Sequence, residues 1–156
     1  YRVAGAELSE DAVRELFDEL ALEPEISRAG ELTHFRGPGI DIFAGDIFAL
    51  GKGLLGPVDA VYDRAALVAL PEEMRHRYAS HLVKISTGAR QFLLCFEYDP
   101  LLLQGPPFSI AESDVLGLYG EAYAISLLAE REFPGGLKGI GPVTETAWLL
   151  HPHKGD

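Results

Sequence analysis

Two neighbouring charges, Asp63 and Arg64, follow a short segment that has the composition of a β-strand. Residues 58–62 are rich in branched and aromatic side chains, and small and apolar residues come after the charged pair. In an α/β sheet, ligands collect at the carboxyl ends of the strands, and a guanidinium placed there could stabilise negative charge on a ligand. An ion pair that only fixes the turn explains the two residues equally well, because such pairs are common at protein surfaces and individually weak.

A carboxylate, Glu7, ends another short segment with strand character. Ser9 can cap the helix that follows, because apolar residues then recur at helical spacing. In a doubly wound fold, an acid at the end of the second strand can accept hydrogen bonds from the two ribose hydroxyls of a nucleotide cofactor. Glu7 is therefore a candidate ribose ligand, and a connection without any ligand is the alternative.

Residues 25–44 predict a hairpin, since Gly37-Pro38-Gly39 is a strong turn signal. Gly45 and Asp46 come just past its last strand, where they offer close backbone approach and a hydrogen-bond acceptor. Such a position often contacts an adenine in nucleotide sites, and otherwise it is a simple turn. The glycine-rich residues 51–57 lack the spacing of a phosphate-binding loop, so we exclude that motif.

The second half of the chain continues the alternation of helices and strands. Residues 91–98 are almost continuously apolar, as in a strand buried on both faces of a parallel sheet. Residues 122–128 and 143–150 predict two final strands, which fit an antiparallel pair at a sheet edge. The alternation as a whole predicts an α/β fold with a mostly parallel sheet. A helix is expected over residues 71–88, with four basic side chains on its solvated face: Arg75, His76, Arg77 and Lys84.

The composition favours a soluble protein that handles small molecules. With 156 residues, the chain is expected to form one domain with a sizeable core. Its formal net charge of -11 argues against a nucleic-acid partner, which needs clustered Lys and Arg. The chain contains no run of about 20 apolar residues, so we expect no membrane span. Its single cysteine, Cys95, lies in an apolar run, which suits an inert core thiol in a reducing compartment such as the cytoplasm.

Three further expectations concern assembly, metals and the start of the chain. We expect a monomer, because no long exposed apolar stripe is apparent in the sequence. We expect no metal site, because two histidines in the tail, His151 and His153, are too few to hold an ion. The first residue is not Met, so the N-terminus is expected to be incomplete.

Five short blocks occur in an order and at a spacing that resemble the thiopurine S-methyltransferase family, a branch of the Rossmann-like methyltransferases that use S-adenosylmethionine. No single block is specific to this family, but the five blocks in this order and at this spacing are. The resemblance covers almost the whole chain and weakens after about Glu132. The blocks are Glu7-Leu8-Ser9, Gly45-Asp46-Ile47-Phe48, the segment from Tyr62 through Asp63-Arg64 to Leu70, Tyr98-Asp99, and Gly105-Pro106-Pro107-Phe108.

The resemblance implies a role for each matching position. Glu7, with Leu8 beside it, would hold the cofactor ribose, and the turn of Asp46 and Ile47 would meet the adenine. Arg64 would lie near the methionine end of the cofactor and the acceptor, as the catalytic residue. The remaining substrate-binding positions would be two members of the last block and the basic residue inside the glycine-rich loop of residues 131–142: Pro106, Phe108 and Lys138.

The chain departs from the family's pattern in two places. The family has a first strand followed by a glycine-containing turn and an N-terminal aromatic segment, whereas this chain begins at what resembles the second strand. We therefore expect residues 1–156 to form a methyltransferase domain that is incomplete at its N-terminus, either as the remainder of a longer protein or as a truncation. The loop of residues 131–142 is also shorter than the family's equivalent, which bears on the choice of substrate.

The activity that the resemblance implies is methyl transfer from S-adenosyl-L-methionine to the sulfur of an aromatic or heterocyclic thiol. No metal is needed for this reaction, because the cofactor carries the difficult chemistry. Two alternatives remain open from the sequence. One is methylation of a metalloid such as tellurite, and the other is a non-catalytic domain that has kept the fold.

Overall fold

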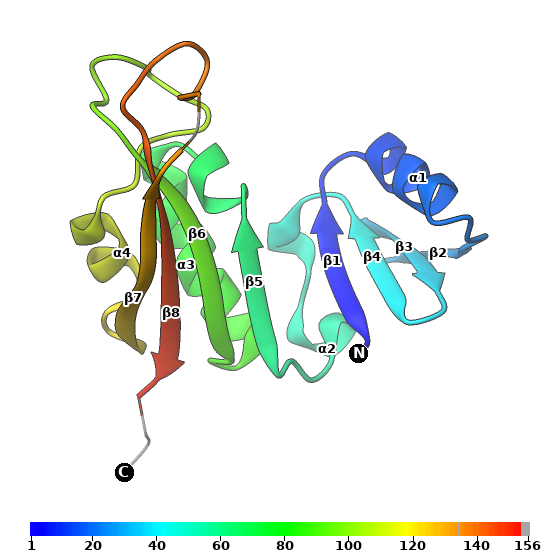
Figure 1. Ribbon diagram of the computed structural model, residues 1–156. Coiled ribbons are helices and arrows are strands. Elements are labelled where there is room, and N and C mark those ends of the chain that lie inside the picture. Colours follow the sequence, from blue (N-terminus) through cyan, green and yellow to red (C-terminus); the bar gives the residue numbers. More distant parts are fainter. Residues whose placement is uncertain (134, 154–156) are drawn as a thin grey trace. The chain divides into compact units, whose positions relative to one another are not determined.

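The computed structural model describes residues 1–133 and 135–153. The chain divides into two compact units, Tyr1–Pro57 and Val58–Asp156. Each unit is built around its own four-stranded sheet (Figure 1). None of the helices in the described ranges is long and apolar enough to cross a bilayer.

The first unit is a mixed sheet with one helix packed on it. The strands lie in the order β1-β4-β3-β2, with β1 parallel to β4 and the other pairings antiparallel. The predicted hairpin is confirmed, because β3 and β4 pair on either side of the Gly37-Pro38-Gly39 turn. The elements are β1 (Val3–Glu7), α1 (Glu10–Glu19), β2 (Glu25–Ala29), β3 (Leu32–Gly37), β4 (Ile40–Ala44), a 3-10 turn (Ile47–Ala49) and the short α2 (Lys52–Leu55).

Helix α1 begins where the sequence predicts and buries a narrow apolar stripe. The side chain of Ser9 accepts a hydrogen bond from the Ala12 N–H, which confirms the predicted cap. Val13 and Phe17 lie one helical turn apart and are almost fully buried. They pack against Phe35 and Ile42 of the sheet to form the core of this unit.

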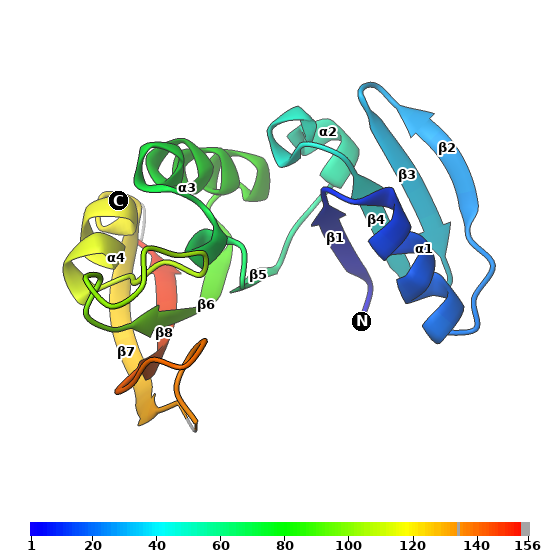
Figure 2. The same ribbon diagram turned by 90° about the horizontal axis from the view of Figure 1, so that it is seen from above.

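The second unit is also a mixed sheet, with strand order β5-β6-β8-β7. Strand β5 is parallel to β6, and the β6–β8 and β8–β7 pairings are antiparallel. Helices α3 and α4 lie on one face of this sheet (Figure 2). The elements are β5 (Ala60–Arg64), a 3-10 turn (Leu67–Ala69), α3 (Glu72–Ser86), β6 (Arg90–Glu97), α4 (Glu112–Tyr119), β7 (Tyr123–Glu132) and β8 (Thr144–Pro152).

The strand directions differ from the expected mostly parallel sheet. Each of the two sheets contains a single parallel pairing, so both are mixed. The connections explain the difference, because only Gly30 and Glu31 separate β2 from β3, and so short a turn can join only antiparallel strands. The predicted antiparallel pair of final strands is confirmed as β7 and β8.

Strand β6 is buried on one face, and the expectation of burial on both faces is wrong. Leu93 and Cys95 point to the helix-covered face and are almost fully buried, whereas Phe92 is 37% exposed on the other face. A run of apolar residues can therefore indicate a strand with one exposed apolar face, as well as a strand that is buried on both faces. The Cys95 thiol is buried, which confirms its expected place in the core, and desolvation raises its pKa to about 12.

Candidate functional site

In the first unit, the candidate ribose and adenine positions lie at the carboxyl ends of two neighbouring strands, β1 and β4. Strands β1 and β4 are parallel neighbours, and Glu7 is in register with Ala44, so both strands end at the same edge. The Gly45 N–H donates a hydrogen bond of 2.8 Å to the Glu7 backbone carbonyl. The sheet pairing therefore brings Glu7 and the Gly45–Asp46 turn together, although they are far apart in the sequence.

The two carboxylates at this edge are exposed and are held by their own turns. Glu7 Oε1 accepts a hydrogen bond of 2.9 Å from the Ser9 N–H, and Asp46 Oδ1 accepts one of 2.9 Å from the Phe48 N–H. Gly45 has a φ of +131°, and a Cβ there would lie 2.8 Å from a methyl group of Leu32, so only glycine fits. The backbone of the turn is thus fixed, and both carboxylates face solvent beside the exposed Leu8.

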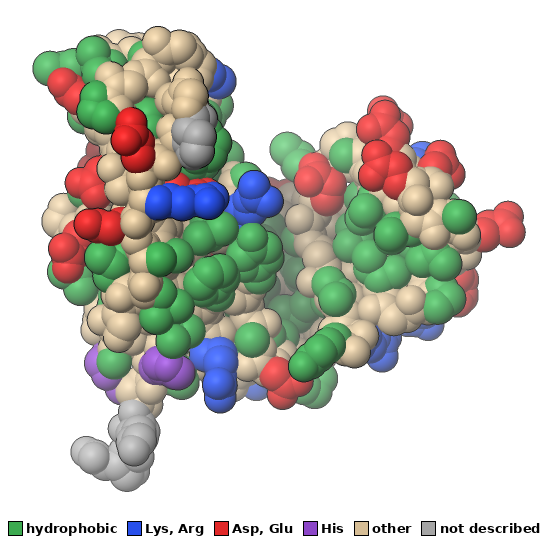
Figure 3. All heavy atoms as spheres, viewed as in Figure 1, with side chains coloured by type: hydrophobic (Ala, Val, Ile, Leu, Met, Phe, Trp, Pro, Cys, Tyr) green, Lys and Arg blue, Asp and Glu red, His purple; other side chains and the backbone are tan. Residues whose placement is uncertain are grey.

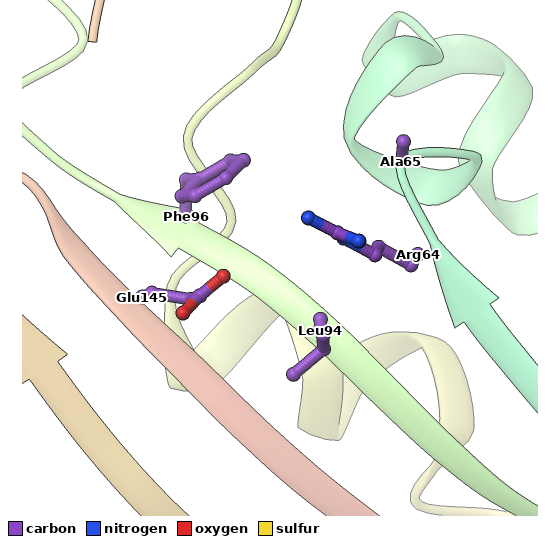
Figure 4. A pocket seen from close by; sticks show the side chains of 5 residues that line it. All are labelled: Arg64, Ala65, Leu94, Phe96 and Glu145. Atoms are coloured by element: carbon purple, nitrogen blue, oxygen red, sulfur yellow. The ribbon is translucent and has the colours of Figure 1, made fainter. Parts of the chain in front are cut away.

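In the second unit, Arg64 lies at the carboxyl end of β5 and lines a cavity of about 320 Å³. The other lining residues come from the strand end itself and from two neighbouring strands, because Arg64 is in register with Leu94, and Phe96 with Glu145. Figure 4 shows the guanidinium of Arg64 directed toward the Phe96 ring and the Glu145 carboxylate. The cavity is lined by Arg64, Ala65, Leu94, Phe96 and Glu145.

Asp63 lies on the opposite face of the strand, so it does not share the cavity with Arg64. Its side chain is 2% exposed and accepts hydrogen bonds from the Tyr78 hydroxyl at 2.9 Å and from the Leu67 N–H at 3.3 Å. Burial raises the pKa of Asp63, although these hydrogen bonds oppose the shift. Because neighbouring strand residues point to opposite faces, the alternative of an Asp63–Arg64 ion pair is wrong, and none is seen in the described chain.

Glu145 is a residue of this cavity that the sequence reasoning did not identify. Its side chain is 11% exposed. Its Oε2 accepts a hydrogen bond of 2.7 Å from Arg131 Nε and forms an ion pair of 2.5 Å with a terminal nitrogen of Arg131. The residue falls inside the predicted strand of residues 143–150. Its position beside Phe96 depends on the pairing register of β8 with β6, which no local pattern reveals.

The sheet face that carries this cavity is apolar. Tyr62 and Phe92 are in register on β5 and β6, and their rings stack with centroids 5.8 Å apart. Both side chains are exposed, and Leu94 and Phe96 continue the same face toward Arg64. Figure 3 shows this hydrophobic surface on the second unit, with basic side chains above it.

The predicted acceptor wall lies in the loops above the strands. Lys138 Nζ donates a hydrogen bond of 2.6 Å to the Pro106 carbonyl, so these two predicted residues are brought together. The Phe108 N–H donates to the Val68 carbonyl at 2.6 Å, which joins this loop to the loop that follows β5. None of Pro106, Phe108 and Lys138 belongs to the lining of the Arg64 cavity within the described residues.

Arg75 corrects the expected solvated face of the long helix. The side chain is 8% exposed, its Nε donates a hydrogen bond of 2.9 Å to the Leu70 carbonyl, and its guanidinium lies 5.2 Å from the centre of the Phe108 ring. Arg75 and Phe108 line a second cavity of about 460 Å³. The sequence analysis grouped Arg75 with exposed residues because of its position in the helical pattern. The Phe108 ring that covers it comes from a loop far away in the chain, which the pattern does not reveal.

The two groups of predicted residues are thus each assembled at strand ends. Glu7, Leu8, Asp46 and Ile47 gather in the first unit, and Arg64 in the second. That Glu7 and Arg64 serve one ligand stays a prediction. Across residues 1–133 and 135–153, no group of three or more His, Cys, Asp or Glu side chains is arranged to hold a metal ion.

The chain is similar to a family of known proteins. A family model described as thiopurine S-methyltransferase (TPMT) matches residues 1–137. "Thiopurine S-methyltransferase" of Xanthobacter autotrophicus is 56% identical over 150 residues, which cover 96% of this chain and 70% of that protein. The protein of the same name from Gluconobacter oxydans is 45% identical over 152 residues, covering 97% of this chain and 69% of its own length.

A solved structure extends the likeness to the fold. The N-terminal domain of EvdMO1, crystallised in the presence of SAH and D-fucose, matches with a TM-score of 0.57 at 11% sequence identity. The match covers 97% of this chain and 66% of that chain. The expected α/β class and Rossmann-like methyltransferase fold are confirmed.

Proposed function

The chain belongs to the thiopurine S-methyltransferase family, and on this premise we propose that it transfers a methyl group from S-adenosylmethionine to the sulfur of an aromatic or heterocyclic thiol. The observation that carries the proposal is the cavity beside Arg64, where the guanidinium faces three apolar side chains and one carboxylate: Ala65, Leu94, Phe96 and Glu145. The apolar side chains suit an aromatic ring better than a small oxyanion such as tellurite. The volume of about 320 Å³ lies near the lower end of the range for small-molecule sites, which suits a compact ring.

The chemistry of the edge formed by β1 and β4 fits the nucleoside part of the cofactor. Glu7 is an exposed carboxylate at a strand end, and one of its oxygens remains outside the contact with Ser9, so it can accept hydrogen bonds from ribose hydroxyls. Leu8 offers apolar surface next to it, and Asp46 and Ile47 form the turn for the adenine. S-adenosylmethionine, when bound, supplies a methyl group attached to a positively charged sulfur. That sulfur is a good leaving group.

The residues of the second unit would act on the acceptor. Arg64 would hold a thiolate by direct charge attraction. Leu94 and Phe96 would exclude water from the ring, which strengthens that attraction. Pro106, Phe108 and Lys138 would form the outer wall, with Lys138 anchored on the Pro106 carbonyl. A thiolate needs no general base, so none is assigned for such an acceptor.

The test measures two properties of the intact protein. Calorimetry with S-adenosylhomocysteine reports cofactor binding, and a methylation assay with thiophenol reports activity. Arg64→Ala should lower kcat/KM for thiophenolate about tenfold or more, which corresponds to ~1.4 kcal/mol of transition-state stabilisation. S-adenosylhomocysteine should still bind, so that the loss is one of acceptor handling.

Arg90→Ala is the matched control. Arg90 is an exposed arginine of the same sheet, at the other end of β6, where it is in register with Ala60. Its replacement should leave kcat/KM unchanged. Equal kinetics for the two variants would contradict the role of Arg64, and failure of the wild-type protein to bind S-adenosylhomocysteine would contradict the proposed activity.

We propose that the protein acts as a monomer in the cytoplasm, where a free cysteine stays reduced.

A further inference from the structure

Glu145 places a second charge on the wall of the Arg64 cavity. The two residues belong to different strands of the sheet, β5 and β8, with β6 between them. No ion pair joins Arg64 to Glu145 in the described chain, so the cavity separates a positive group from a negative one. The space between them is walled by Leu94 and Phe96.

The Glu145 carboxylate contacts Arg131 through one of its oxygens. The hydrogen bond from Arg131 Nε and the ion-pair contact of an Arg131 terminal nitrogen both go to Oε2. Oε1 is therefore not engaged by Arg131, and the carboxylate in Figure 4 points into the cavity. With its side chain only 11% exposed, this carboxylate is partly shielded from water, so a hydrogen-bond donor brought to it is recognised strongly.

A ligand that suits both charges is a dipolar ring. Its electron-rich sulfur would face the Arg64 guanidinium, and an N–H on the same ring would face the Glu145 carboxylate. Cyclic thioamides have this arrangement, because the ring N–H lies next to the C=S group and the sulfur carries partial negative charge. Thiophenol has a sulfur and a ring of similar size but no N–H, so it would use only Arg64.

We propose that Glu145 is an acceptor-binding residue that selects cyclic thioamides over simple aromatic thiols by accepting a hydrogen bond from the ring N–H. This inference rests on the proposed function and deepens it. On S-methylation of such a ring, the sulfur gains a methyl cation and the nitrogen loses its proton, so the charge of the acceptor is unchanged. The carboxylate at the end of the N–H hydrogen bond is the group that takes up this proton.

The experiment compares pyridine-2-thione with thiophenol in the intact protein. Glu145→Gln should raise KM for pyridine-2-thione about tenfold, because the charged acceptor of the hydrogen bond is lost. KM for thiophenol should stay within about twofold of the wild-type value. Calorimetry of pyridine-2-thione with protein saturated by S-adenosylhomocysteine should show the same tenfold weakening, independently of turnover.

Arg131→Gln is the matched control for loss of the ion pair. This variant breaks the same contact with Arg131 but leaves the Glu145 carboxylate in the cavity wall, so it should retain the preference for pyridine-2-thione. Glu145→Asp keeps the charge one methylene further from the cavity and should give an intermediate KM. If circular dichroism shows that Glu145→Gln does not fold, Glu145→Asp replaces it in the comparison of the two acceptors.

The outcomes separate the two proposals. If Glu145→Gln changes both acceptors equally, or if Arg131→Gln reproduces its effect, Glu145 acts only through the structure and the inference is overturned. If the wild-type protein methylates neither acceptor and does not bind S-adenosylhomocysteine, the proposed function itself fails. A selective loss of pyridine-2-thione binding in Glu145→Gln, with Arg131→Gln unaffected, supports the inference.

Discussion

Asp63 and Arg64 are adjacent in the chain and serve opposite faces of the sheet. Arg64 is exposed on the apolar face, while Asp63 is buried on the helix side, where its carboxylate accepts hydrogen bonds from Tyr78 and Leu67. Ala65 lies between Asp63 and Leu67 in the chain and has a φ of +68°. This left-handed conformation costs a residue other than glycine about 1 kcal/mol. The buried carboxylate thus holds a strained turn in the shape that presents Arg64.

The buried Asp63 makes the stability of the protein depend on pH in a defined direction. Because burial raises the pKa of Asp63, the folded protein binds its proton more tightly than the unfolded chain does. This residue's contribution to the free energy of unfolding therefore falls as pH rises from near 3.8 to the raised pKa of the folded state. In Asp63→Asn this contribution is absent. Urea titrations from pH ~4 to ~7 should show the stability of the wild type, relative to the variant, decreasing with pH.

Tyr78→Phe gives a second measurement of the same group. The Tyr78 hydroxyl is a hydrogen-bond donor that opposes the raised pKa of Asp63, so its removal should raise that pKa further. The decrease in stability should then extend to higher pH than in the wild type. A stability difference between the wild type and Asp63→Asn that is flat or rises with pH would contradict this account of Asp63.

At the scale of elements, helix α3 fixes the two loops that border the candidate acceptor site. Arg75 of α3 donates to the Leu70 carbonyl, at the end of the loop after β5, and its guanidinium covers Phe108 in the loop after β6. The two loops also meet directly through the Phe108 N–H and the Val68 carbonyl. One buried guanidinium therefore joins a helix to both loops.

Arg75→Gln should destabilise the protein and loosen the loop that carries Phe108. The loss of a charged donor leaves the Leu70 carbonyl without its partner, at a cost of about 1–3 kcal/mol. Urea unfolding measures this cost, and hydrogen exchange at the Phe108 amide should become faster. Lys84→Gln, an exposed change on the same helix, is the control and should stay within about 0.5 kcal/mol of the wild type. Equal stability of the two variants would mean that Arg75 carries no such link.

The sequence predicted elements and strand ends better than it predicted contacts between elements. The cap at Ser9, the turn at Gly37-Pro38-Gly39 and the antiparallel final strands all depend on local patterns, and the structure contains them. The burial of Arg75 and the position of Glu145 depend on a loop and on a strand register far away in the chain. Local periodicity carries no information on such partners, which is why Arg75 was wrongly expected to be solvated and Glu145 was not identified.

At the scale of the whole molecule, the candidate acceptor site lies in a strongly acidic chain. The formal net charge is -11, whereas the Arg64 cavity would attract a thiolate. These two effects have different ranges. The net charge acts over tens of ångströms and is screened at moderate ionic strength, because the Debye length shrinks from about 30 Å at ~0.01 M to about 10 Å at ~0.1 M. The attraction by Arg64 acts at contact and is screened much less.

The long-range repulsion should therefore be visible as a salt dependence. With S-adenosylmethionine saturating, kcat/KM for thiophenolate should rise severalfold between ~0.01 and ~0.1 M salt, because screening removes the depletion of anions near the protein. The neutral pyridine-2-thione has no net charge to repel, so its kcat/KM should change little over the same range. Arg64→Ala should lower the values for thiophenolate and keep their rise with salt, since the repulsion comes from the chain as a whole. A fall with salt in the wild type would mean that local attraction by Arg64 outweighs the repulsion by the net charge.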